Sequence, residues 1–332
     1  MRQQCSDAGP LVSIILLVYN GERYVSECAR SVANQRYRNL EVIVIDNGSR
    51  DGSVAALKAS FPDWMYLEHE GNLGFAAGMN SGLEIARGAY VVPLNQDVYL
   101  EEDFIGKGVE LMGILPRAGA LGGLEYKWVG GKLTDELRSP GPALFLRFRI
   151  QGILLTTDTP VAPTFGVNGS FPFLRREALQ ELVQLDGHAY DPSFFSGWED
   201  QDLWWRLQLR GWECYATQAY KAWHVGASFA DENQTFLSKP IQYQRWVMRN
   251  RRLVIMKNLP LPLLAMLSPM LLGFEVSLPL YLLLRSRRSL GAWLSSWKDI
   301  IVSLPSIWSR RQVIQRTRRL PLGAVMGWFK GI

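Results

Sequence analysis

Three short runs of apolar residues constrain the fold of this chain more than any other feature. They are Leu11–Val18, Leu40–Ile45 and Ala89–Leu94, and each is nearly continuous. Such runs are typical of strands that are buried on both faces of a parallel sheet. The segments between them carry apolar or small residues at helical spacing, and Trp64–Leu67 reads as a further short strand. This alternation predicts an α/β fold with a doubly wound, mostly parallel sheet.

Two of the predicted strands end in an aspartate. Asp46 follows the second run, and Asp97 follows the third through Asn95 and Gln96. Ligands of open α/β sheets bind beyond the carboxyl ends of the strands, where a carboxylate can hold a divalent cation against a phosphate. One aspartate at such a position more often begins a turn. Two of them in the same sheet indicate a nucleotide and metal site.

The glycine-containing turn Gly71–Gly78 leads into a helix that we expect to end near Arg87. Glycines at a strand-to-helix turn allow backbone amides to approach a phosphate. Their spacing is not that of the dinucleotide fingerprint G-x-G-x-x-G, and the turn has no Walker lysine. The pattern therefore disfavours a nicotinamide dehydrogenase, and a structural turn explains the glycines equally well.

The next part of the chain is less regular. We expect a helix over Glu101–Leu115, a small-residue strand or turn at Gly119–Gly123, and a strand over Gly166–Leu174. Residues 125–165 read as an irregular stretch that contains the apolar and basic segment Ala143–Leu155. Long loops are usually functional or mobile, so this one is expected to shape an acceptor pocket or to pack onto the C-terminal region.

A second dense stretch contains four acids between Asp191 and Asp202. Glu199 and Asp200 follow Trp198 and lie in the first turn of a predicted helix. Acids in a first turn interact favourably with the helix dipole, which is the structural interpretation. In the functional interpretation one acid is a general base, whose pKa an apolar neighbour such as Trp198 tunes towards the working pH.

His224 is one of three histidines in the chain. It follows a predicted short strand at Gly211–Ala216. A lone histidine is more often a hydrogen-bonded structural residue than a metal ligand. Its position downstream of the acidic stretch keeps it as a candidate ligand.

Charge divides the chain into two parts. Residues 240–332 hold fifteen Lys and Arg against two acids, a net charge of +13, which leaves −8 of the overall +5 for residues 1–239. We therefore expect a globular domain over 1–239, which the family resemblance given below implies to be catalytic, with a donor-binding half at about 11–100 and an acceptor half at about 101–239. The remainder, 240–332, is expected to be a basic, apolar helical region.

The C-terminal region has the pattern of a membrane-associating segment. Leu259–Leu284 is long enough to span a bilayer, which needs about 20 residues, but it holds four prolines and Glu275. Re-entrant or interfacial helices suit such a sequence better than a plain spanning helix. Ala292–Ile307 is amphipathic and carries tryptophans, as interfacial segments do. Because basic residues bracket these apolar runs, an anionic membrane surface is favoured over nucleic acid; the alternative is a second soluble helical domain or an oligomer interface.

The cysteines and the N-terminus bear on the compartment. Cys5, Cys28 and Cys214 have no paired spacing, so neither a zinc cluster nor a disulfide framework is indicated. Met1–Pro10 lacks the apolar run of a signal peptide. We expect the protein on the cytoplasmic side of the inner cell membrane, as a peripheral or monotopic protein.

Six segments in this order resemble those of a known family. They are Val12–Asn20, Glu41–Ser53, Asn72–Asn80, Leu94–Asp97, Trp198–Arg206 and His224–Ser228. The set, over residues 11–230, resembles glycosyltransferase family 2 and, within it, the bacterial rhamnosyltransferase-like branch. The resemblance implies a GT-A nucleotide-diphospho-sugar transferase fold, a nucleotide-sugar donor, a divalent cation (Mg²⁺ or Mn²⁺) and inversion at the anomeric carbon.

The resemblance also implies roles for individual residues. Asp97 matches the metal-binding carboxylate of the D-x-D motif, in which Asn95 replaces the first aspartate, and His224 matches a histidine that coordinates the metal in some relatives. Asp200 matches the general base of the ED motif. The donor-binding candidates are Tyr19, Asn20, Asp46, Asn72, Gly74, Asn95 and Gln96. The acceptor-side candidates are Trp198, Glu199 and Gly169.

These observations lead to an expected function. It is the inverting transfer of a sugar, with rhamnose from dTDP-rhamnose as the expected donor, to a polyprenyl-linked or growing surface glycan. The expected partners are the donor, this acceptor and an anionic membrane surface, with a homo-oligomer through the C-terminal region as a further option and no nucleic acid. The alternative is a catalytically degenerate nucleotide-sugar-binding scaffold in a membrane glycan assembly complex, against which the intact acidic cluster argues.

Overall fold

The computed structural model describes residues 9–138, 160–226 and 235–329. The strands are β1 (Val12–Val18), β2 (Leu40–Asp46), β3 (Met65–Glu68), β4 (Tyr90–Asn95), β5 (Val98–Leu100), β6 (Ala118–Val129), β7 (Lys132–Leu137), β8 (Val161–Thr164), β9 (Phe173–Arg175) and β10 (Glu213–His224). The helices are α1 (Val25–Ala33), α2 (Ser53–Ser60), α3 (Phe75–Ile85), α4 (Phe104–Ile114), α5 (Arg176–Asp186), α6 (Glu199–Leu209), α7 (Ile241–Asn258), α8 (Leu261–Arg285), α9 (Arg287–Arg316), α10 (Leu322–Met326) and a short 3₁₀ turn, Phe236–Ser238.

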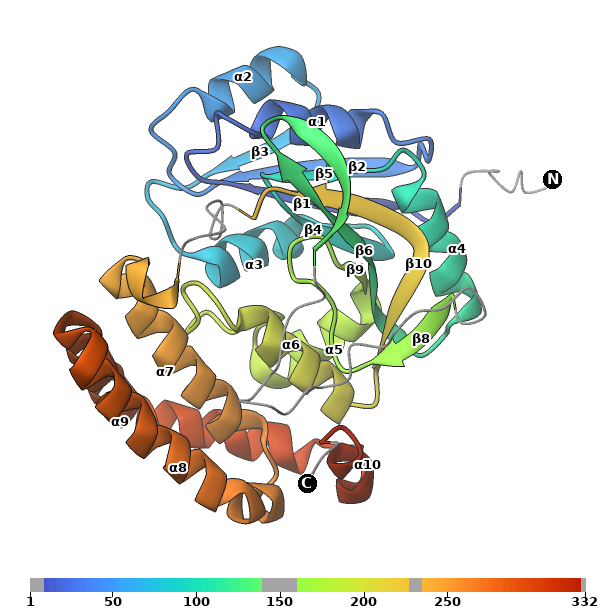
Figure 1. Cartoon of the computed structure of the whole chain (residues 1–332). Helices are drawn as coiled ribbons and strands as arrows, with labels where there is room; N and C mark the ends of the chain where they lie inside the picture. The colour runs from blue at the N-terminus through green and yellow to red at the C-terminus, as the bar shows by residue number, and fades with distance from the viewer. Residues whose placement is uncertain (1–8, 139–159, 227–234, 330–332) are drawn as a thin grey trace.

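One mixed sheet organises these elements, in the order β3-β2-β1-β4-β9-β6-β10-β5 (Figure 1). The first four strands are parallel. The short β9 is antiparallel to both β4 and β6, and β10 returns parallel to β6. Mixed sheets of this kind are common among large α/β folds. The predicted α/β fold with a mostly parallel sheet is confirmed.

Alternate residues of β1 point to opposite faces of the sheet, as the strand's period of two requires. Ile14 and Leu16 pack in a core that contains residues of α1 and α4. Ile15 belongs to a second core that contains residues of α3, α5 and α6. Both faces of the parallel strands are therefore covered, which explains why the strand sequences are apolar without alternation.

Two expectations for the second half of the chain were wrong. Within the stretch expected to be irregular, β6 runs on to Val129 and pairs with β7 as a hairpin. The apolar–polar alternation from Leu124 to Trp128 is the pattern of a half-buried strand. Of Gly166–Leu174, only the last two residues lie in a strand, because the residues before them form a loop against α6. The segment Ala143–Leu155 lies outside the described residues.

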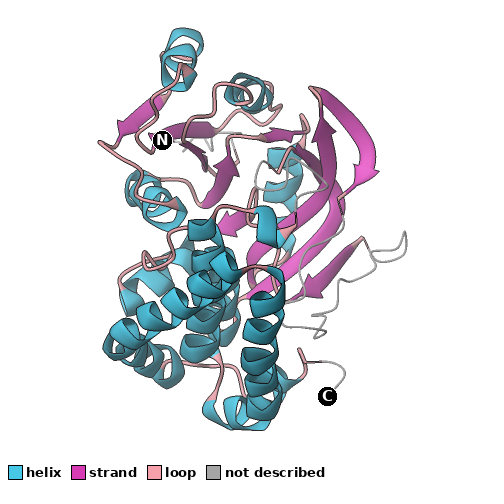
Figure 2. Cartoon of the chain, turned by 60° about the vertical axis from the view of Figure 1, so that its left-hand side comes forward, coloured by secondary structure: helices cyan, strands magenta, loops and turns pink. Residues whose placement is uncertain are grey.

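The three long C-terminal helices gather below the sheet (Figure 2). The apolar run Leu259–Leu284 forms a single helix, α8, although Pro269 and Pro279 lie inside it. Glu275 is ion-paired with Arg251 and Arg252 of α7, which accounts for an acid in the middle of this run. By length and composition α8 is the one helix of the described residues that could cross a membrane, which is weak support for a span.

A buried ionic network joins α6 to the C-terminal helices. Lys257 of α7 pairs with Asp191 and, at 2.9 Å, with Asp202 of α6. Arg206 binds Asp202 at 2.8 Å, and Arg310 of α9 binds Asp191 at 2.7 Å. Burial alone would raise the pKa of each aspartate, but the adjacent cations outweigh it and hold both pKa values below the usual range. Two of the four clustered acids are thus structural.

The domain boundary expected at residue 240 stays a prediction.

Candidate active site

The donor-binding candidates of β1 and β4 lie together at the carboxyl edge of the sheet. Gln96 accepts from the Tyr19 amide at 2.8 Å and donates to the Tyr19 carbonyl at 3.0 Å. Asn20, in the left-handed region at φ 47°, accepts from the Arg50 amide at 2.9 Å, and its own amide donates to the Ser49 hydroxyl at 3.0 Å. These bonds fix the ends of β1, β2 and β4 relative to one another.

The neighbouring turn brings Asp46, Asn72 and Gly74 to the same edge. Asp46 is buried at the end of β2 and accepts from a backbone amide of the following turn at 2.9 Å. Asn72 accepts from the Asn47 side chain at 3.0 Å and from the Gly74 amide at 2.8 Å. Gly74 has φ 84°, and a Cβ there would lie 2.5 Å from the Phe195 carbonyl oxygen. Close approach of the loop before α6 therefore requires this glycine.

Asp97 and His224 form a contact pair beside this edge. The strand expected at Gly211–Ala216 is longer than predicted, because β10 runs to His224 and pairs it with Val98. His224 Nε2 lies 3.3 Å from Asp97 Oδ1, and Nδ1 lies 2.6 Å from Glu125 Oε1. Burial lowers the pKa of His224, but the hydrogen bonds and charges of Asp97 and Glu125 outweigh it and raise the pKa to about 9.

The donor set suits a cation that shares its coordination with a ligand. Neighbouring ligands of an octahedral ion, each at about 2.1 Å, are about 3 Å apart, close to the 3.3 Å between His224 Nε2 and Asp97 Oδ1. Glu125 engages Nδ1 and leaves Nε2 for a metal, the usual arrangement of a carboxylate behind a ligating histidine. Within the described residues no group of three or more His, Cys, Asp or Glu side chains is arranged to hold an ion. Phosphate oxygens and water would have to complete the shell.

Glu125 is a site residue that the sequence analysis missed. It accepts from the Asn168 side chain and pairs with Arg138 at 3.3 Å, in addition to its contact with His224. Its position in a strand was legible in the alternation of β6. Its contact with His224 was not, because β6 and β10 are nearly 100 residues apart at this point.

Asp200 and Glu199 occupy the first turn of α6, after Trp198, which adopts the left-handed conformation at φ 73°. Burial raises the pKa of Asp200. Burial and then the charge of Asp200 raise the pKa of Glu199 to about 8. Gly169 lies directly against this turn, since a Cβ there would be 2.8 Å from Asp200 Oδ2. The raised pKa values suit both carboxyl groups to exchange a proton at a higher pH than an ordinary carboxyl group would.

The loop of residues 166–171 connects the two halves of the site. Asn168 contacts Glu125, the partner of His224, and the next residue, Gly169, backs Asp200. The Ser170 carbonyl also accepts from the Asn95 amide at 2.9 Å. The structure therefore brings the predicted metal ligands and the predicted base to one side of the sheet, on separate segments. Their roles stay predictions.

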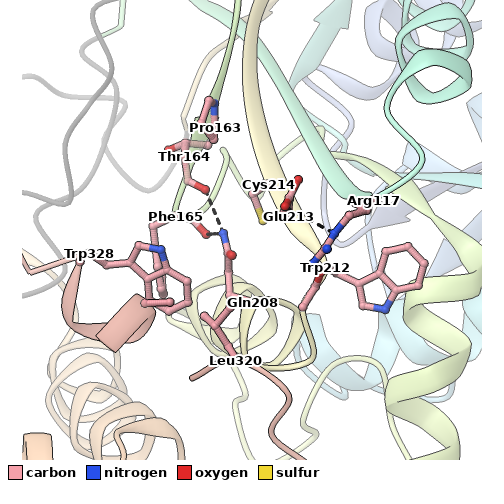
Figure 3. A pocket seen from close by; sticks show the side chains of 13 residues that line it. Arg117, Pro163, Thr164, Phe165, Gln208, Trp212, Glu213, Cys214, Leu320 and Trp328 are labelled. Carbon is pink, nitrogen blue, oxygen red and sulfur yellow. Dashed lines mark hydrogen bonds and ion pairs between the residues drawn. The ribbon is translucent and has the colours of Figure 1, made fainter. Parts of the chain in front are cut away.

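A cavity of about 280 Å³ lies elsewhere in the molecule (Figure 3). Arg117, Glu213 and Trp212 line it at the start of β6 and β10, and Trp328 lines it from the C-terminal segment. His224 ends β10, so this cavity is at the opposite end of that strand from the candidate site. None of the predicted donor-binding residues lines it.

The sequence matches the family described as glycosyl transferase family 2 over residues 13–183, slightly more than half of the chain. A similar curated relative is the putative glycosyltransferase EpsH of Bacillus subtilis (strain 168), 35% identical over 97 residues, which are 29% of this chain and 28% of that protein. The chain thus matches well under half the length of this relative.

Solved structures show the same architecture. The mannosyltransferase PcManGT from Pyrobaculum calidifontis, in complex with GDP-Man and Mn²⁺, has a TM-score of 0.56 at 15% identity and covers 98% of this chain and 88% of its own. GalNAc-T7 with UDP, GalNAc and Mn²⁺ has a TM-score of 0.58 at 14% identity, covering 76% of this chain and 48% of its own. These likenesses show that the fold is the GT-A fold.

Proposed function

Since the chain belongs to glycosyltransferase family 2, we propose that it is an inverting, metal-dependent enzyme that transfers a sugar from a nucleotide-sugar donor to a glycan. One observation carries the proposal. The Asp97–His224 pair and the Asp200 carboxylate come from separate segments and are linked through the adjacent residues Asn168 and Gly169. An inverting reaction needs this separation, because the base and the leaving group lie on opposite sides of the sugar.

Each group then has a part in the reaction. The oxygen of the acceptor hydroxyl bonds to the anomeric carbon, and Asp200 accepts the proton of that hydroxyl. The bond between the anomeric carbon and the diphosphate breaks, and its electron pair stays on the leaving oxygen. Asp97 and His224 would hold a divalent cation, which supplies charge stabilisation to the departing diphosphate. Glu125 orients His224 through Nδ1. The donor-binding candidates at the carboxyl edge of the sheet hold the nucleotide.

We propose dTDP-rhamnose as the specific donor. It is supported by the six motifs, including the Asn95 variant of the D-x-D motif. A panel of nucleotide sugars in thermal-shift assays, with and without Mg²⁺ or Mn²⁺, tests it: dTDP-rhamnose should stabilise the protein most. Donor binding without transfer to a broad acceptor panel would instead favour the scaffold alternative.

The metal assignment predicts that Asp97→Asn weakens Mn²⁺ binding at least about tenfold, because it removes the charged ligand of a two-residue site. Titration of Mn²⁺ by electron paramagnetic resonance, with nucleoside diphosphate present, measures this without turnover. Asp63→Asn, at an exposed turn before β3, is the matched control. Equal affinity of both variants for Mn²⁺ would contradict the assignment.

We also propose that α8 and α9 attach the enzyme to an anionic membrane, on the cytoplasmic side, where a polyprenyl-linked acceptor is accessible. Apolar residues four apart form a stripe on α8, each at least 58% exposed: Leu272, Val276, Leu280 and Leu284. Ile301, Val302 and Trp308 of α9 are similarly exposed. Basic residues follow the α8 stripe at Arg285, Arg287 and Arg288. An apolar face bordered by arginines suits an anionic interface.

The double variant Leu280→Glu and Leu284→Glu should bind vesicles of phosphatidylglycerol and phosphatidylcholine at least about tenfold more weakly, because each buried leucine contributes about 1.5–3 kcal/mol. Co-sedimentation measures the bound fraction. Leu133→Glu with Leu137→Glu, two exposed leucines of β7, is the control pair and should bind like wild type. Unchanged binding by the α8 variant would favour a soluble helical domain or an oligomer interface, which sedimentation velocity distinguishes.

A further inference from the structure

The turn before Asp200 has an unusual backbone. Gly197 has φ 81° and Trp198 has φ 73°, so two successive residues adopt the left-handed conformation. For a bulky residue such as Trp198 this conformation is strained, and it persists only where the surroundings impose it. Because Trp198 caps the N-terminus of α6, this turn sets the direction in which the Asp200 side chain leaves the helix.

A buried asparagine of α7 holds this turn. Asn250 is fully buried, and its Nδ2 donates to the Ser196 carbonyl at 3.1 Å and to the Gly197 carbonyl at 2.7 Å. Its Oδ1 accepts from Arg249 Nε at 2.9 Å, and another nitrogen of Arg249 donates to the Ser193 carbonyl. The amide is therefore fixed in orientation, and it satisfies two carbonyls that the left-handed turn presents to α7.

Phe195, which precedes this turn in the same loop, is held by α3 and by α7. The Phe195 carbonyl accepts from the Phe75 amide of α3 at 2.7 Å, and the Phe195 ring stacks on Trp246 of α7 at 4.4 Å. Figure 1 shows α7 beside α6, below α3. The loop is clamped between α3 and α7, and Asn250 supplies the contacts nearest to Asp200.

From this geometry we propose that Asn250 is a positioning residue for the base: it holds the Ser196–Trp198 turn so that Asp200 faces the acceptor hydroxyl. The proposal rests on the proposed function of Asp200. A C-terminal helix therefore has a part in the chemistry that is separate from membrane attachment. A displacement of about 1 Å can cost about 10²-fold in rate. We expect Asn250→Ala to lower kcat by about 10- to 100-fold while donor affinity stays within about twofold.

The matched control is Gln244→Ala. Gln244 is also a fully buried amide of α7, and its Nε2 donates to the Leu237 carbonyl at 3.1 Å and the Lys239 carbonyl at 2.8 Å, away from the base. Both variants remove a buried amide that bonds two carbonyls, so both should lose similar stability. Only the Asn250 variant should lose kcat. Asn250→Asp, of the same shape but without the donating N–H groups, replaces Asn250→Ala if the latter does not fold.

The experiment measures kcat per donor-binding site, with the site concentration taken from calorimetric titration by nucleoside diphosphate and Mg²⁺. Hydrogen exchange of residues 193–202 is followed in the same samples. The proposal predicts a lower kcat per site and faster exchange in this segment for the Asn250 variants alone. A wild-type kcat per site, unchanged exchange, or an equal loss of kcat in Gln244→Ala would overturn it. If wild type transfers no sugar from any donor, the proposed function fails, and the inference falls with it.

Discussion

Asp200→Asn should bind the donor with wild-type affinity but transfer sugar about 10²–10⁴-fold more slowly, the usual contribution of a general base. The amide keeps the shape and the hydrogen bond from the Gln201 amide, which is 2.7 Å from Oδ1, but it cannot accept a proton from the acceptor. Single-turnover transfer measures the chemical step, and calorimetric titration measures donor affinity. Transfer at the wild-type rate would rule out Asp200 as the base.

Asp202→Asn is the informative neighbour control. Asp202 lies two residues further along α6 but is paired with Arg206 and Lys257 rather than directed at the site. This variant should lose stability, while its folded fraction keeps a kcat near that of wild type. If Asp202→Asn loses transfer but not stability, the general base would be Asp202 rather than Asp200.

The pH dependence of transfer follows from the carboxyl pair. Burial raises the pKa of Asp200, and burial together with the charge of Asp200 raises the pKa of Glu199 to about 8. A base must be ionised to accept a proton, so kcat should fall as the pH drops through the raised pKa of the pair. We expect the acid limb of the kcat profile above about pH 4, the ordinary range of an aspartate. Asp200→Asn should remove that limb from its residual activity.

Lys257→Met should lower the free energy of unfolding by about 3–5 kcal/mol, the usual result of removing one partner from a buried ion pair. The methionine fills similar space but leaves Asp191 and Asp202 without the cation between them, and both carboxylates are fully buried. Urea denaturation followed by tryptophan fluorescence measures the change.

The control for Lys257→Met is the same substitution in an exposed pair. Lys58 and Glu68 pair at the surface, where removal of a charge costs less than about 1 kcal/mol.

The folded-state pKa values of Asp191 and Asp202 are depressed, so their stabilisation is present above the unfolded pKa of about 4 and is lost as the pH falls through the folded values. The wild-type advantage over Lys257→Met should therefore shrink in acid. Equal effects of the two lysine substitutions would contradict the buried-network interpretation.

The parallel half of the fold was predictable because its signals are local. The apolar runs of β1, β2 and β4 lie within one or two residues of the predicted ranges. The second half was harder to predict. In β6 the glycines at 119, 122 and 123 left a strand and a turn both open, because glycine carries no side-chain pattern, and the continuation of the strand past Leu124 was expected to be irregular. The loop from Gly166 to Phe171 looked like a strand, but its glycines serve close approach to Trp204 and Asp200.

The candidate site was predicted in part. Asp97, His224 and Asp200 were identified from motifs, and the structure brings the first two within 3.3 Å. Glu125 and Asn250 were not, because nothing in their local sequence distinguishes them. Each acts through a residue far along the chain: Glu125 contacts His224, and Asn250 contacts Gly197. Such pairs become visible only once strand and helix packing is known.

The sequence by itself determined the parallel half of the sheet, the carboxyl edge where Asp46 and Asp97 emerge, the family, and the charge contrast of the C-terminal region. These depend on the periodicity, the residue types and the motifs of short segments, which are complete within a few residues. Tertiary structure alone decided which of the four clustered acids are structural. Asp191 and Asp202 face Lys257, whereas Glu199 and Asp200 do not. The reason is physical: adjacent positions in one helical turn point in different directions, and a carboxylate's role depends on the partner that the rest of the chain brings to it.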